Sequence, residues 1–176
     1  MEYLAAMLSQ SYHYPWLGAL VLTALIGTIC LAFRGYLIRM QGAPVRLLAY
    51  APALTLLVML NHYGTSLSAL GALCAAVVLA WLYSRTSLNK PVGRFTWLLL
   101  LYGISYWLIG GTSLVFAAMS VIFEIGVRRA WLVGATAAAA SAVIPYLAGR
   151  YWFQTSTTDA YLRLSILQYD LEPIVA

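Results

Sequence analysis

Apolar residues occur along the chain in six long runs, and charged or turn-forming residues separate them. The runs cover residues 16–33, 47–61, 66–84, 95–109, 112–127 and 130–148. Such runs are typical of helices that cross a membrane, which need about 20 residues for about 30 Å of hydrocarbon. Several runs are shorter, which requires local thinning of the bilayer or helix ends buried in protein. The pattern predicts an all-α polytopic transmembrane helical bundle with six spans arranged as three hairpins.

The range 95–127 is the ambiguous part of this pattern, because it could form one helix or two. A single helix would be on the order of 50 Å long at 1.5 Å per residue, far more than the hydrocarbon thickness. The pair Gly110-Gly111 lies at its middle. We therefore expect two short helices joined by a Gly-Gly turn.

The positive charges support six spans independently. Eight of the ten basic residues fall in alternate connections between the runs, namely Arg34, Arg39, Arg46, Arg85, Lys90, Arg94, Arg128 and Arg129. This is the positive-inside pattern, and it places both termini outward. A chain with five spans, in which 95–127 crosses once, would put Arg128 and Arg129 on the opposite side, so the charges disfavour it.

Composition agrees with a membrane protein, since 63% of the residues are hydrophobic and only 9% are charged. The formal net charge is +5, but the basic residues form no patch with interleaved aromatics, so nucleic acid is not predicted as a partner. Cys30 and Cys74 lie in apolar runs without neighbouring ligands, so neither a metal site nor a disulfide is expected. We predict an integral membrane protein surrounded by lipid, with no cofactor.

The chain changes character after the sixth run. Residues 1–153 form the predicted transmembrane domain, and residues 154–176 form an outward-facing tail that would fit the start of a further soluble region. The polar stretch Thr155–Asp159 resembles a linker or a helix cap. In the stretch 160–172, helical and strand periodicities fit equally well, so both remain open.

Two runs carry small residues at every fourth position, which lets another helix approach closely. The third run has Ser68, Ala72, Ala76 and Ala80, and the sixth has Gly134, Ala138 and Ala142. A protein partner or a second copy of the chain could pack on these faces. Alanine-rich spans also produce such spacing by chance, so chance remains the alternative.

Glu124 is the only acidic residue within a predicted span, and acids in spans are functional candidates because burial of an unpaired charge is costly. Arg128 follows four residues later on the same helix face, near the predicted inner end. We favour a structural pair whose ends reach the membrane interface over a site for a proton or a transported substrate.

Aromatic and polar residues gather on the predicted outward face. His13 and His62 are the candidate general bases, and the candidate binding residues are Tyr12, Tyr14, Asn61, Tyr63 and Trp107. They could bind a headgroup, a glycan or a lipid-linked substrate. The alternative is an interfacial belt, because Trp and Tyr gather at membrane interfaces without any binding role. No pair of carboxylates accompanies the histidines, which weakens an acid–base mechanism.

Two segments of the chain stand out as motifs: Glu2–Gln10, running on through Tyr14–Ala19, and Tyr106–Gly111, followed at a distance by Phe123-Glu124. They resemble an uncharacterised family of large bacterial membrane proteins found mainly in Bacteroidetes, which implies a location in the bacterial inner membrane. The resemblance implies that the chain corresponds to the membrane core of that family, without its preceding span or its larger outward domain. It implies fold and location but no chemistry, and it gives Glu124, Gly110 and Gly111 weight as structural features.

No nucleotide, serine-hydrolase or zinc-protease motif occurs in the chain. The first functional hypothesis is therefore a membrane-anchoring or assembly subunit that packs through the third and sixth runs. The second is a membrane enzyme, or part of one, that acts on a lipid-linked or glycan substrate at the outer face. The third is a transport subunit that uses Glu124.

Overall fold

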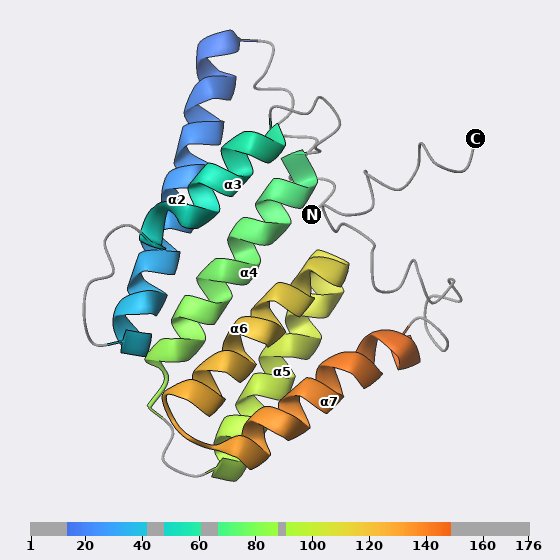
Figure 1. Cartoon of the computed structure of the whole chain (residues 1–176). Helices are drawn as coiled ribbons and strands as arrows, with labels where there is room; N and C mark the ends of the chain where they lie inside the picture. Colours follow the sequence, from blue (N-terminus) through green and yellow to red (C-terminus); the bar gives the residue numbers. More distant parts are fainter. Residues whose placement is uncertain (1–13, 42–47, 61–66, 88–90, 149–176) are drawn as a thin grey trace.

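The computed structural model describes residues 14–41, 48–60, 67–87 and 91–148, and this part of the chain is helical without strands (Figure 1). The all-α prediction is thereby confirmed for these residues. Prolines begin two of the helices, at a position where their missing N–H is not needed. The elements are α2 (Pro15–Gln41), η2 (Leu48–Tyr50), α3 (Ala51–Leu60), α4 (Leu67–Arg85), α5 (Pro91–Ile109), η3 (Gly110–Thr112), α6 (Ser113–Gly126) and α7 (Trp131–Ala148).

Helix α2 is longer than the apolar run that predicts it. The run ends at residue 33, but the helix continues through Arg34 and Arg39 to Gln41. Tertiary contacts explain the extension, because Tyr36 is buried and its hydroxyl donates to the backbone carbonyl of Met119 on α6 at 2.7 Å. The expected position of both arginines in a connecting loop is wrong, since they lie on the last turns of a helix.

The chain reverses direction at the predicted Gly-Gly turn. Gly110 has a φ of 62°, a left-handed conformation that favours glycine, and it opens the short helix η3 between α5 and α6. Arg94 near the start of α5 lies 3.2 Å from Glu124 near the end of α6. Thirty residues of continuous helix would separate these two side chains by about 45 Å. Helices α5 and α6 therefore run antiparallel, as Figure 1 shows.

Three apolar helical stretches are long enough to cross a membrane: Trp16–Met40, Ser68–Arg85 and Pro91–Gly126, the last folded back at η3. Helix α7 provides a shorter apolar stretch, Trp131–Leu147. Helix α3 has 10 residues, about 15 Å, where the pattern predicted a full span over 47–61. Length and composition thus suggest a membrane location, while the six crossings stay a prediction.

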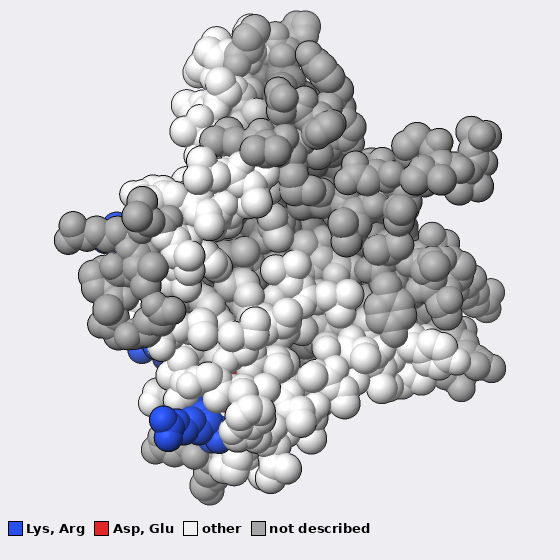
Figure 2. Space-filling view, viewed as in Figure 1, with Lys and Arg blue, Asp and Glu red and all other residues white. Residues whose placement is uncertain are grey.

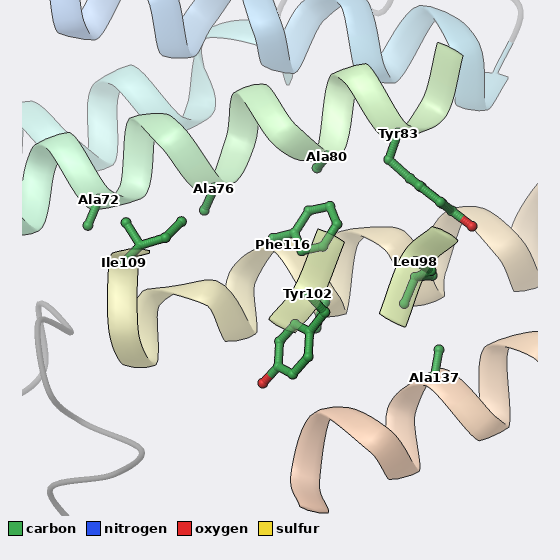
Figure 3. Packing of buried hydrophobic residues seen from close by; sticks show 10 residues of the cluster. Ala72, Ala76, Ala80, Tyr83, Leu98, Tyr102, Ile109, Phe116 and Ala137 are labelled. Atoms are coloured by element: carbon green, nitrogen blue, oxygen red, sulfur yellow. The ribbon is translucent and has the colours of Figure 1, made fainter. Parts of the chain in front are cut away.

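Helix α4 is the centre of the fold and has a buried cluster on each side. Toward α2 and α3, Ile29, Leu56, Leu70 and Cys74 pack together. Toward the other three helices lies a larger cluster, seen in Figure 3, in which the alanines of α4 face Ile109 and the ring of Phe116. This cluster comprises Ala72, Ala76, Ala80, Tyr83, Leu98, Tyr102, Ile109, Phe116, Ala117 and Ala137.

The two stripes of small residues differ in what they contact. Ala72, Ala76 and Ala80 are fully buried inside the chain, so the stripe on α4 serves the packing of this bundle. Of the three stripe residues on α7, Gly134 is buried against Ile125 of α6, whereas Ala138 and Ala142 are exposed. The packed face of α7 instead contains Val133 and Ala137. Association with a partner through these faces remains a prediction that applies to α7 more readily than to α4.

Candidate functional site: a buried carboxylate shared by two arginines

The carboxylate of Glu124 lies inside the bundle at the end of α6, and its side chain is 0% exposed. Three donors from different parts of the chain reach it. Oε1 accepts from the hydroxyl of Tyr83 on α4 at 2.8 Å and from Nη1 of Arg128 at 2.6 Å. Oε2 accepts from Nη1 of Arg94 on α5 at 3.2 Å. One carboxylate therefore joins the end of α4, the start of α5 and the end of α6, which lie at the lower end of the bundle in Figure 1.

The backbone after α6 positions Arg128. Arg129 adopts a φ of 50°, so the chain turns sharply, and the N–H of Ala130 donates to the carbonyl of Glu124 at 3.0 Å. The Nη2 group of Arg128 donates to the carbonyl of Thr86, just beyond α4.

The same guanidinium also lies against two aromatic rings. Its central carbon is 5.6 Å from the ring centroid of Tyr83 and 5.1 Å from that of Phe123. Contacts within about 6 Å of a ring favour a cation. Arg128 is thereby held by hydrogen bonds at its edge and by rings at its faces.

The charges of the cluster do not cancel. Two guanidinium groups, 15% and 16% exposed, share one carboxylate, which leaves one excess positive charge in a largely buried place. Buried charges are stable only when they are paired and hydrogen-bonded, and removal of one partner of such a pair is strongly destabilising. Both carboxylate oxygens are already occupied by donors. The arrangement suits an ionic cluster that holds the helix ends together better than it suits a free acid or base.

Three buried polar atoms of the described residues have no hydrogen-bond partner: Nε of Arg94, Oγ of Ser113 and Oγ of Ser120. Elsewhere in the described part, nine hydroxyl groups of Ser and Thr donate to a backbone carbonyl three or four residues earlier. The two serines lie on the same face of α6 as Glu124. A buried hydroxyl without a partner costs roughly 1–3 kcal/mol, so the burial of these two serines lowers the stability of the fold.

The predicted outer-face site falls mostly where the structure is not described. His13, His62, Tyr12, Asn61 and Tyr63 lie outside the described residues. Two of its members are described: Tyr14 is 60% exposed and Trp107 is 75% exposed. The structure does not bring these two together with a catalytic group, and the histidines stay a prediction.

Sequence reasoning found half of the buried cluster. The contact of Glu124 with Arg128 has the predicted four-residue spacing, and the carboxylate is enclosed by protein. Its position near the membrane interface stays a prediction. Tyr83 and Arg94 were missed as partners. Arg94 looked like a loop residue because the apolar run begins at 95, and its place in the first turn of α5 brings it to the carboxylate. The available signal was Pro91, because a proline often begins a helix and would place Arg94 in the first turn.

Fold and site together define an all-α protein with membrane-length apolar helices and an ionic cluster around the buried carboxylate of Glu124. The chain matches, over residues 1–175, a family described as a family of unknown function (DUF6057). It therefore belongs to that family, in agreement with the resemblance to an uncharacterised one. No curated relative and no solved structure matches the chain.

Proposed function

We infer that the chain is a multi-pass inner-membrane protein with six crossings and outward termini, whose bundle serves as a membrane-anchoring or assembly subunit. The observation that carries this is an inverted distribution of polarity. The only acid among the described residues is fully buried and accepts three hydrogen bonds, while large apolar side chains such as Leu132 and Trp107 are exposed. Such a surface is stable in hydrocarbon and aggregation-prone in water.

The arginines support the orientation. All six described arginines lie at the same end of the bundle: Arg34 and Arg39 on the last turns of α2, Arg85 at the end of α4, Arg94 in the first turn of α5, and Arg128 with Arg129 after α6. Figure 2 shows basic side chains at the lower end of the bundle. Positive charge accumulates on the cytoplasmic side of membrane proteins, so we assign this end to the cytoplasm.

The enclosed carboxylate, with a donor on each oxygen, favours a structural role over transport or catalysis. A proton carrier or general base needs an oxygen that can exchange its partners, and both oxygens of Glu124 are bound by donors from other segments. The second crossing is the shortest, since η2 and α3 together cover about 20 Å. It therefore needs residues on either side of 48–60 as well.

Cysteine labelling tests the orientation and the crossings. Cys30 and Cys74 are first replaced by Ala, and single cysteines are introduced at Tyr14, Ser87 or Thr23. A membrane-impermeant maleimide should label Tyr14→Cys in intact cells and Ser87→Cys only after permeabilisation, because these exposed sites lie at opposite ends of the bundle. Thr23→Cys, exposed in the middle of α2, is the control and should stay unlabelled in both cases.

Two results would contradict the proposal. Labelling of Ser87→Cys in intact cells would reverse the orientation. Extraction of the wild-type chain from membranes by alkaline carbonate would exclude an integral membrane protein altogether. If the chain is an assembly subunit, purification in mild detergent should also recover a stoichiometric partner or a stable oligomer, and a monomer without a partner would argue against that role.

A further inference from the structure

The line along which α2 and α4 contact each other, called the α2–α4 seam below, carries basic residues at its lower end. The two helices run parallel, because Sγ of Cys74 lies 3.9 Å from the carbonyl of Leu25 near their middle, and Trp81 contacts Gly35 further along both. A Cβ at Gly35 would lie 2.7 Å from Cδ1 of Trp81, so the indole rests directly on the α2 backbone. This contact fixes the register of the two helices.

Arg39 and Arg85 lie at the same end of this seam. Each lies four residues, one helical turn, beyond the contact of Gly35 with Trp81, and both are exposed. They are thus neighbours on two parallel helices that end at the same level. Like charges in such a position repel each other unless an anion lies between them.

No acid of the described part can supply that anion. Glu124 is the only one, and it is buried and already bound to Arg94 and Arg128. The guanidinium of Arg85 stacks on the ring of Trp81, with its central carbon 4.2 Å from the ring centroid. Stacking uses the face of the guanidinium and leaves its N–H edges free to donate to two oxygens of a phosphate.

The seam becomes apolar above the arginines. Leu31, one turn before Gly35 on the same side of α2, is 70% exposed. From the lower end upward, the order is a pair of cations, an indole, and an exposed aliphatic surface. The same order of charge, interface and hydrocarbon describes an anionic phospholipid, whose phosphate lies at the level where Trp side chains gather.

We propose that the α2–α4 seam binds an anionic phospholipid, with its phosphate between Arg39 and Arg85, its glycerol region beside Trp81, and an acyl chain along Leu31. This rests on the membrane location and orientation proposed above. A free phosphate would share the contacts with the arginines but would leave the apolar surface uncovered. The site therefore takes a lipid.

Native mass spectrometry of the full chain in mild detergent measures the binding of dioleoyl-phosphatidylglycerol against dioleoyl-phosphatidylcholine. The double variant R39Q/R85Q should bind phosphatidylglycerol about tenfold more weakly, since a bidentate arginine–phosphate contact is lost with each change. The matched control R34Q/R129Q removes the same charge from two other exposed arginines of the same end and should change binding less than about twofold.

Equal losses in both double variants would overturn the site, because they would reflect general attraction to positive charge. Equal affinity of the wild type for both lipids would do so as well. Displacement of the lipid by excess inorganic phosphate would show that chains contribute nothing and would overturn the choice of a lipid.

If R39Q/R85Q does not fold, a phosphatidylglycerol with a photoreactive headgroup keeps the proposal testable in the wild type. Its crosslinks should map to the last turns of α2 and α4, and crosslinks confined to other helices would refute the site. Binding in detergent does not depend on orientation, whereas the cysteine labels do not depend on lipid binding. The failure of one proposal is therefore distinguishable from the failure of the other.

Discussion

Replacement of Glu124 by Gln should destabilise the bundle strongly, because the change removes the anion shared by two largely buried guanidinium groups. In the wild type the local charge is one positive unit in excess, and in E124Q it is two with no counter-charge among the described residues. Loss of one partner from a buried ion pair costs about 3–5 kcal/mol. The amide oxygen of Gln can still accept a hydrogen bond, so we expect about 3 kcal/mol.

Thermal unfolding in mild detergent, followed by the fluorescence of the six tryptophans, measures this effect. A loss of about 3 kcal/mol corresponds to a decrease in Tm of about 6–12 °C for a chain of this size. The arginine variants provide an internal comparison. R94Q leaves a neutral pair and removes only the 3.2 Å contact, whereas R128Q also removes the bond to Thr86 and the contacts with two rings.

The expected order of destabilisation is therefore E124Q, then R128Q, then R94Q. In the double variant E124Q/R94Q, loss of the second cation should recover part of the stability lost in E124Q. A Tm of E124Q equal to that of the wild type would refute the stabilising role of the ionic cluster. An R94Q variant less stable than R128Q would refute it as well. Additive losses in E124Q/R94Q would show that the two groups do not interact.

Three further substitutions test other contacts by the same unfolding measurement. Tyr83→Phe removes one donor to the buried carboxylate and should cost about 1–3 kcal/mol, and an unchanged Tm would contradict that hydrogen bond. Gly35→Ala places a methyl group against Trp81 and should cost about 1–3 kcal/mol. Its control, Gly27→Ala on the same helix, meets open space and should be neutral or stabilising. Equal effects of the two substitutions would refute the close contact. Gly110→Ala forces a side chain into a left-handed conformation and should cost about 1–2 kcal/mol, and a neutral result would mean that the turn tolerates another conformation.

The length of the apolar runs predicted the helices, because a long apolar stretch in a membrane satisfies its backbone hydrogen bonds within a helix. The break at Gly110-Gly111 was also predictable, since a glycine pair marks a turn and a single helix would be too long. The ends of the helices were less predictable. Arg34, Arg39 and Arg94 lie on helices and not in loops, because contacts from other segments extend helices past the end of an apolar run.

What the sequence by itself determined is therefore the all-α class, the apolar helices, the reversal at Gly110 and the pairing of Glu124 with the arginine four residues later. Only the tertiary structure decided that Tyr83 and Arg94 complete that pair, that the small residues of α4 are buried within the chain, and that Arg39 and Arg85 are neighbours. The reason is physical. Local patterns report the backbone and residues one turn apart, whereas the register between helices distant in the sequence depends on how their side chains pack.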